Sequence, residues 1–132
     1  MKILLDTDVI IECLKGNKEI IAILEGLYEE GCIISFAPIS RAEVYAGLRK
    51  GEEKETNELL QTIESLPIDD KIGQVAGTYL AKFRKSHSLE IADALIAATA
   101  MVNKAHLYTL NQKHYPMEDV KKYQKSYGGE TK

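Results

Sequence analysis

Short apolar runs alternate along this chain with longer stretches in which apolar residues recur every three or four positions. The runs cover residues 2–5, 32–37 and 106–110, and a weaker run covers residues 66–68. Short apolar runs bounded by polar breaks predict buried strands, whereas the longer spacing predicts amphipathic helices. Because strands and helices alternate, we expect an α/β fold with a central, mostly parallel sheet of four to five short strands flanked by helices.

The helical stretches have recognisable ends. Helices are expected over residues 9–15, 18–30, 40–50, 52–65, 70–86 and 91–103. Glycines follow several of them, and either Thr7 or Asp8 is expected to cap the first helix. The last helix, over residues 91–103, is apolar on nearly every side, which indicates that it is buried.

Length and charge limit the organisation of the chain. A chain of 132 residues predicts a single domain, which we place at residues 1–122, followed by a basic, flexible tail at residues 123–132. The net charge is −3, although residues 121–132 contain four lysines and one glutamate, so the rest of the chain is more acidic. This balance argues against a large nucleic-acid face but does not exclude a segregated one.

The cysteines and the apolar runs predict a cytoplasmic protein without a membrane partner. Cys13 and Cys32 have no motif spacing, which is typical of reduced thiols. The chain begins directly with a strand pattern and lacks the features of a leader segment. The longest nearly apolar run, residues 91–102, contains Asp93 and is too short to cross a bilayer.

Three acidic residues occupy positions at which acids are costly. Asp6 ends a predicted buried strand, Glu43 lies in the helix after another strand, and Asp93 lies in the first turn of the most apolar helix. Since the carboxyl ends of parallel strands and the starts of the following helices meet at one edge, the three are expected to face one cleft. Two carboxylates about 4 Å apart repel by about 4 kcal/mol, and a divalent cation removes this cost. Oxygen ligands favour one or two Mg²⁺ or Mn²⁺ ions.

Each acid also has a purely structural interpretation. Asp6 can accept hydrogen bonds from the free N–H groups of the next helix, and Asp93 can favour the positive end of its own helix. Ser40 and Glu43 match the spacing of a capping box, and Asp8 is expected to be a cap and not a reactive group. The residues alone leave these alternatives open.

Three blocks of sequence together resemble the PIN-domain ribonucleases, specifically the VapC-type toxins of toxin–antitoxin pairs. The blocks are "ILLDTDVIIECLKG", "ISRAEVYAGLRK" and "IADALIAATAMVNKAHLYTLNQKHY", and they span nearly the whole chain. By this resemblance Asp6, Glu43 and Asp93 are the catalytic and metal-binding acids. It implies a Mg²⁺- or Mn²⁺-dependent endoribonuclease that hydrolyses RNA and is inhibited by a small, VapB-like antitoxin.

One motif departs from the family pattern. Where the family often has threonine, asparagine, an acid and an aromatic residue, this chain has Thr109, Asn111, His114 and Tyr115, so a histidine replaces the acid. His114 is expected to bind metal weakly, contact phosphate or support a ligand, or else to be an ordinary loop histidine. Thr7, Thr109 and Asn111 are expected to support the acids by hydrogen bonding.

Substrate and protein partners are predicted from charge and apolar pattern. The residues expected to contact RNA are basic: Arg41, Arg49, Lys50, Lys82, Arg84 and Lys85. Apolar positions within residues 20–27 and 59–63 are expected to support a homodimer. Two alternative functions remain: a haloacid-dehalogenase-like phosphatase that uses Asp6 and Asp8, and a PIN-like RNA- or protein-binding module without enzymatic activity.

Overall fold

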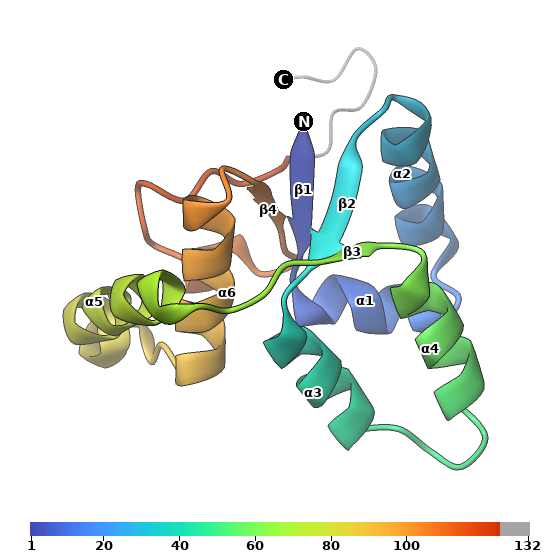
Figure 1. Ribbon diagram of the computed structural model, residues 1–132, viewed down its shortest axis with the longest axis horizontal. Helices are drawn as coiled ribbons and strands as arrows, with labels where there is room; N and C mark the ends of the chain where they lie inside the picture. The colour runs from blue at the N-terminus through green and yellow to red at the C-terminus, as the bar shows by residue number, and fades with distance from the viewer. Residues whose placement is uncertain (125–132) are drawn as a thin grey trace.

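The computed structural model describes residues 1–124 and contains a four-stranded sheet in which every neighbouring pair is parallel (Figure 1). The strand order is β3-β2-β1-β4, so the first strand is central. The strands are β1 (Lys2–Leu5), β2 (Ile33–Phe36), β3 (Glu64–Ser65) and β4 (His106–Tyr108). The expected α/β class with a parallel sheet is confirmed.

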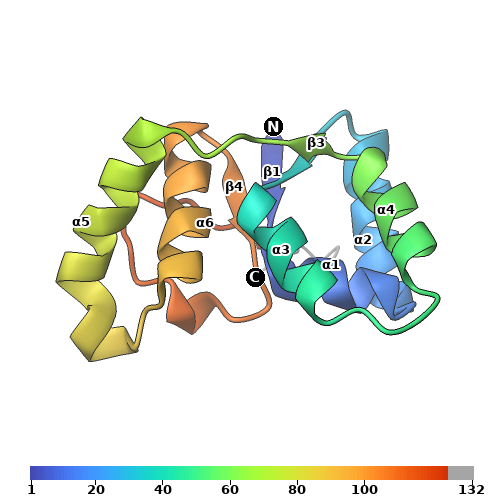
Figure 2. The ribbon, with the colours of Figure 1, turned by 60° about the horizontal axis from the view of Figure 1, so that its bottom comes forward.

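Within residues 1–124, six α-helices and one 3₁₀ helix connect and cover these strands. They are α1 (Thr7–Leu14), α2 (Lys18–Glu29), α3 (Pro38–Ala46), α4 (Glu53–Gln61), α5 (Asp70–His87), α6 (Ile91–Val102) and the 3₁₀ helix η1 (Gln112–His114). Figure 2 shows α5 and α6 on one side of β1, and α1, α2 and α4 on the other. In residues 1–124, no helix is long and apolar enough to cross a membrane.

The central strand divides the core because successive side chains of a strand point to opposite faces. Leu4 belongs to a buried cluster with residues of α5 and α6, among them Ile96 and Leu80. Ile3 and Leu5 belong to a second buried cluster with residues of α1, α2 and α4. Both faces of β1 are therefore covered, which explains why residues 2–5 form a continuous apolar run.

Several predicted boundaries are wrong. The third strand is Glu64–Ser65 and not residues 66–68, because these two residues are the ones in register with β2, and α4 ends earlier, at Gln61. The helix expected from residue 40 begins at Pro38, whose fixed backbone suits a first helical position. The first helix is capped by Asp6, and neither Thr7 nor Asp8 is its cap.

The last described residues lie along the open edge of β4. The Leu107 N–H donates to the Lys121 carbonyl at 2.8 Å, and the Tyr123 N–H donates to the Leu107 carbonyl at 2.8 Å. The ring of Tyr123 packs on that of Tyr108, with 5.1 Å between their centroids. Residues 125–132, most of the predicted tail, lie outside the described residues.

Candidate metal-binding active site

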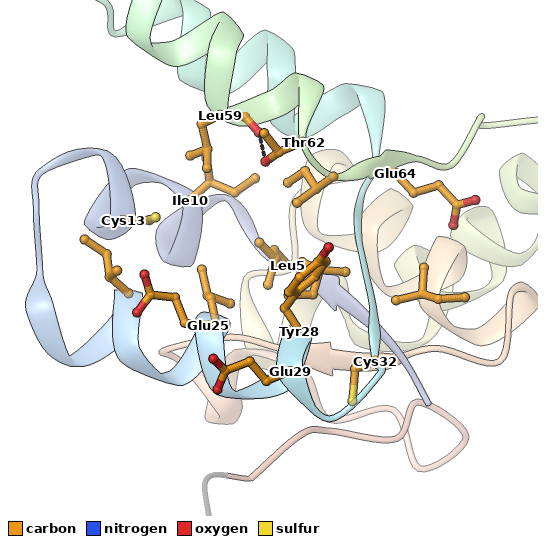
Figure 3. Close-up of a pocket in the computed structure, with 15 residues that line it drawn as sticks. Leu5, Ile10, Cys13, Glu25, Tyr28, Glu29, Cys32, Leu59, Thr62 and Glu64 are labelled. Atoms are coloured by element: carbon orange, nitrogen blue, oxygen red, sulfur yellow. Dashed lines mark hydrogen bonds between the residues drawn. The ribbon is translucent and has the colours of Figure 1, made fainter.

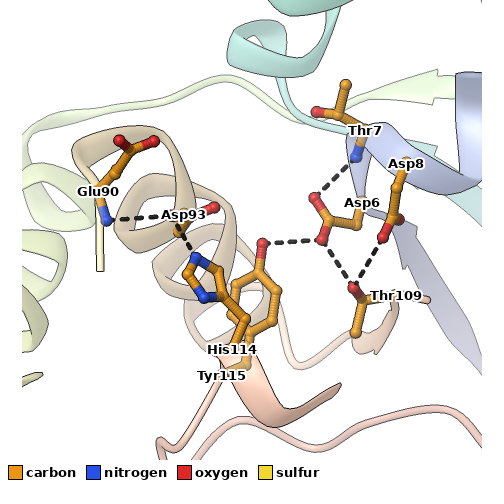
Figure 4. A network of polar contacts seen from close by, with 8 residues as sticks. All are labelled: Asp6, Thr7, Asp8, Glu90, Asp93, Thr109, His114 and Tyr115. Carbon is orange, nitrogen blue, oxygen red and sulfur yellow. Dashed lines mark hydrogen bonds and ion pairs between the residues drawn. The ribbon is translucent and has the colours of Figure 1, made fainter. Parts of the chain in front are cut away.

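Asp6 lies where β1 passes into α1 and is the best-held acid of the candidate site. Its side chain is only 8% exposed. Its Oδ1 accepts a hydrogen bond from the Thr7 N–H at 2.8 Å, and its Oδ2 accepts from the hydroxyls of Thr109 and Tyr115, each at 2.8 Å (Figure 4). The helix-capping interpretation of Asp6 is therefore confirmed, but two of its three donors come from the distant C-terminal part of the chain.

Tyr115 lies at the centre of the acidic residues and is 1% exposed. Burial, followed by the charge of Asp6 and its hydrogen bond, raises the pKa of Tyr115 far above its usual range, and the charges of Asp93 and Asp8 add to this effect. The phenol therefore keeps its proton at physiological pH and donates a hydrogen bond to Asp6. The sequence alone marks Tyr115 only as the aromatic end of a motif and gives it no role.

Asp93 occupies the first turn of α6, as predicted. Its Oδ2 accepts the Glu90 N–H at 3.0 Å, which forms one half of a capping box, so its role at the helix start is confirmed. The same oxygen lies 2.9 Å from Nε2 of His114. His114 is thus partly exposed and contacts an acid from another element, and a role for it at the site stays a prediction.

Glu43 is joined to the β1–α1 junction through Thr7. The Thr7 hydroxyl donates to Glu43 Oε1 at 2.6 Å, and its oxygen lies 2.9 Å from Oγ of the buried Ser40. Ser40 does not cap α3, because Ala37 precedes the first helical residue there, so the predicted capping box is wrong. Glu43 itself is exposed.

Asp8 is an acidic neighbour for which the sequence predicted a capping role, or a reactive role only in the phosphatase alternative. Its Oδ2 accepts the Leu110 N–H at 3.1 Å and lies 3.4 Å from the Thr109 hydroxyl oxygen, whereas its buried Oδ1 has no hydrogen-bond partner among the described residues. Burial, together with the charge of Asp6, raises the pKa of Asp8 to about 6. Its position two residues after Asp6 was the available signal.

The acidic side chains have the chemistry of a divalent-cation site, although three of them do not lie close enough together to form a complete set of ligands. Within residues 1–124, no three histidine, cysteine, aspartate or glutamate side chains lie together as a ready-made metal site. In the same residues, no lysine or arginine forms an ion pair with Asp6, Asp8, Glu43 or Asp93. Oxygen donors without a protein cation, one of them a buried oxygen without a partner, fit Mg²⁺ or Mn²⁺.

The other predicted residues differ in how they are placed. Asn111 is exposed, and its backbone N–H donates to the Thr109 hydroxyl at 3.1 Å. Arg41 is half-buried, and its guanidinium packs on two rings, 5.5 Å from the centroid of Phe36 and 5.6 Å from that of Tyr45. The remaining candidates for RNA contact are exposed: Arg49, Lys50, Lys82, Arg84 and Lys85.

Comparison with known proteins identifies the family to which the chain belongs. The sequence profile described as "PIN domain" matches residues 3–120. The chain belongs to the PIN-domain family. Within that family it is a VapC-type member: Ribonuclease VapC10 of Mycobacterium tuberculosis is 35% identical over 116 residues, which cover 87% of this chain and 86% of that protein.

Two further comparisons agree. Ribonuclease VapC19 of M. tuberculosis is 30% identical over 115 residues, which cover 86% of this chain and 92% of that protein. A solved toxin–antitoxin complex from Klebsiella pneumoniae contains a chain with a TM-score of 0.71 and 26% identity, over 89% of this PIN domain's chain and 93% of its own.

A second surface feature lies on the other side of α1. It is an apolar groove of about 900 Å³, and Figure 3 shows its lining residues on α1, α2, α4 and the strands beside them. Its lining includes Ile21, Leu24, Leu59 and Ile63, which fall within or beside the two apolar stretches predicted to support association. Tyr28 is 74% exposed at this groove.

Proposed function

We propose that this VapC-type PIN domain is a divalent-metal-dependent endoribonuclease and the toxin of a toxin–antitoxin pair. The observation that carries the proposal is the set of carboxylates around the carboxyl end of β1, in which Asp6 is held by three neutral donors and, within residues 1–124, by no lysine or arginine. The curated relatives are named ribonucleases, and that activity is proposed here for this chain.

In this proposal Asp6, Glu43 and Asp93 hold one or two Mg²⁺ or Mn²⁺ ions. When bound there, such an ion would supply Lewis-acid chemistry, activating a water and stabilising the charge of the scissile phosphate. Thr109 and Tyr115 fix the Asp6 carboxylate, while Thr7 ties Glu43 to the same junction. Oriented acids keep the donor oxygens in place before the substrate arrives, so less reorganisation is needed during the reaction.

The decisive test is cleavage of RNA by the purified chain with Mn²⁺, with excess chelator, and with the variant Asp6→Asn. We expect Mn²⁺-dependent products with 5′-phosphate and 3′-hydroxyl ends, and loss of cleavage in Asp6→Asn and in chelator. Cyclic phosphate ends, or full activity in chelator, contradict the metal-dependent mechanism. If the folded chain binds RNA without cleaving it, the non-enzymatic binding module is the correct function.

The phosphatase alternative makes a different prediction. In the phosphatase alternative Asp6 is the nucleophile and Asp8 its partner, but no lysine in residues 1–124 forms an ion pair with either acid. We therefore expect no hydrolysis of a small phosphate monoester under conditions in which RNA is cut. Fast release of phosphate from such a monoester favours the phosphatase instead.

The expected protein partner is a VapB-like antitoxin, because a free ribonuclease in the cytoplasm damages its host. The similar solved structure from K. pneumoniae is a toxin–antitoxin complex. We propose that an apolar antitoxin segment lies in the groove beside α2, with an arginine that reaches the acids and replaces the metal charge.

The same groove contains positions predicted to form a homodimer, so the test must separate the two partners. Tyr28→Glu changes an exposed side chain and leaves the core intact. We expect this variant to bind the antitoxin less tightly while it still cleaves RNA. If it instead converts a dimer of this chain to a monomer, the groove is the homodimer interface.

A further inference from the structure

Two adjacent residues in the C-terminal part of the chain hold two acids that come from different elements. Tyr115 donates to Asp6 at the end of β1, and His114 contacts Asp93 at the start of α6. The two rings are nearly perpendicular, at 86°, with centroids 5.8 Å apart, so each orients the other. Figure 4 shows the pair between the two acids.

The contacts of Asp93 leave one of its oxygens for a ligand. Oδ2 accepts the Glu90 N–H at 3.0 Å and lies 2.9 Å from His114 Nε2, whereas no hydrogen bond to Oδ1 occurs among the described residues. With its proton on Nε2, the imidazole donates to Oδ2 and fixes the rotation of the carboxylate. Oδ1 is then the oxygen presented to a cation.

The contacts of Asp6 follow the same logic. Three donors occupy three of the roughly four lone-pair positions of the carboxylate, so the orientation of the remaining one is fixed. The Tyr115 hydroxyl supplies one of these donors, at 2.8 Å from Oδ2.

We infer that His114 and Tyr115 form a positioning clip that orients Asp93 and Asp6 toward one divalent cation, with His114 acting through Asp93 and not as a metal ligand. The inference rests on the proposed metal-dependent function. It gives His114 a role different from that of the acid it replaces, because a donor orients a carboxylate that a second acid would repel. Groups that orient metal ligands typically change metal affinity by about 10- to 100-fold.

The test is Mn²⁺ binding by the full chain, measured by calorimetry, with paramagnetic resonance of the bound ion. His114→Ala removes the donor, whereas His114→Gln keeps an N–H at a similar reach. Tyr115→Phe removes the hydroxyl that binds Asp6. The matched control is Tyr79→Phe. Tyr79 lies on α5, away from the acids at β1, and the variant removes an equivalent hydroxyl that donates to the carboxylate of Asp119 at 2.8 Å.

We expect His114→Ala and Tyr115→Phe each to weaken Mn²⁺ binding by about tenfold, His114→Gln to restore most of the loss, and Tyr79→Phe to bind Mn²⁺ normally. The spin-echo spectrum of Mn²⁺ bound to the unaltered chain should show no coupling to a directly bound nitrogen. Such a coupling, or equal affinities in all variants, overturns the inference. If the unaltered chain binds no Mn²⁺ at all, the proposed function itself fails.

Discussion

The hydroxyl of Tyr115 donates a 2.8 Å hydrogen bond to Oδ2 of Asp6, although 109 positions separate the two residues in the chain. The bond joins the end of the central strand to the segment that follows β4. Thr109 donates to the same oxygen at 2.8 Å, so the C-terminal segment contributes two of the three donors to Asp6. The acid that is central to the proposed chemistry therefore depends on the last quarter of the chain for its orientation.

Thr109→Val tests this dependence. Valine has nearly the same shape as threonine but removes the hydroxyl, which leaves a buried carboxylate oxygen with one donor fewer. We expect the free energy of unfolding to fall by about 1–3 kcal/mol, because the variant lacks a hydrogen bond to a buried charged group. Urea unfolding at neutral pH measures the change.

Thr109→Ser is the matched control, since it keeps the hydroxyl and removes only a methyl group. It should retain most of the stability that valine loses. Equal losses in the two variants show that packing of the methyl group, and not the bond to Asp6, stabilises this position.

Asp8→Asn is expected to change how stability depends on pH. Burial and the charge of Asp6 raise the pKa of Asp8 from 3.8 to about 6 in the folded chain. Between these values the folded state keeps a proton that the unfolded state releases, so the stability contributed by Asp8 falls as pH rises through this window and stays low above it.

Asparagine does not titrate, so only the unaltered chain loses this stability between pH 4 and pH 7. Measured in chelator, the free energy of unfolding of Asp8→Asn minus that of the unaltered chain should therefore be larger at pH 7 than at pH 4. Because part of the side chain remains in water, we expect a difference of only about 1 kcal/mol between the two pH values. Urea unfolding at both pH values measures it. An identical effect of the variant at pH 4 and pH 7 contradicts the raised pKa.

The periodic elements were predictable because their signals are local. The buried run at residues 2–5 and the spacing in residues 70–86 each identify their element without reference to the rest of the chain, and the structure has β1 at Lys2–Leu5 and α5 at Asp70–His87. Boundaries with two competing local signals were not predictable in the same way. At α3, the spacing of Ser40 and Glu43 suggested a capping box, but Pro38 sets the helix start.

Acidic positions were predictable, whereas their hydrogen-bond partners were not. Strand ends and first turns identified Asp6 and Asp93 as unusual acids. The partners of Asp8 lie 101 and 102 residues away, at Thr109 and Leu110, and no local pattern encodes such a contact. For the same reason the sequence indicated a cap at Asp8, while the tertiary fold makes it a link between α1 and the segment after β4.

Tyr79→Phe is expected to weaken the fold without affecting the acids at β1. The Tyr79 hydroxyl donates to Asp119 at 2.8 Å, which joins α5 to the C-terminal segment. Burial, and then the hydrogen bond to Asp119, raise the pKa of Tyr79 above its usual value of 10. The stabilising effect of the hydroxyl is therefore complete below pH 10 and is lost as pH rises toward the raised pKa.

We expect the free energy of unfolding of Tyr79→Phe to be about 1 kcal/mol lower than that of the unaltered chain at pH 8. This deficit should shrink above pH 10, because the unaltered chain then loses stability as its unfolded state releases the Tyr79 proton, whereas phenylalanine has no such proton. Urea unfolding across this range measures both effects. A deficit that stays constant from pH 8 to pH 11 contradicts the raised pKa of Tyr79.

The basic end of α5 is expected to bind the RNA backbone. Arg84 and Lys85 lie in the last turn of this helix, and α5 and α6 are joined through the short segment 88–90, so this end is close to the start of the helix that carries Asp93. Both side chains are exposed, and neither forms an ion pair within residues 1–124. An acidic cleft repels phosphate, so cations at its rim provide the attraction that the acids cannot.

The double variant Arg84→Gln, Lys85→Gln should weaken binding of single-stranded RNA and lower the salt dependence of affinity, by about 0.7 in the slope of log K against log salt for each phosphate that the protein no longer neutralises. Lys71→Gln, an exposed lysine in the first turn of the same helix, is the matched control and should change neither quantity. Binding is best measured in Asp6→Asn, which removes cleavage while it retains the basic surface. If the double variant and Lys71→Gln lower the slope equally, the attraction comes from the net charge of the protein, and RNA does not bind specifically at the C-terminal end of α5.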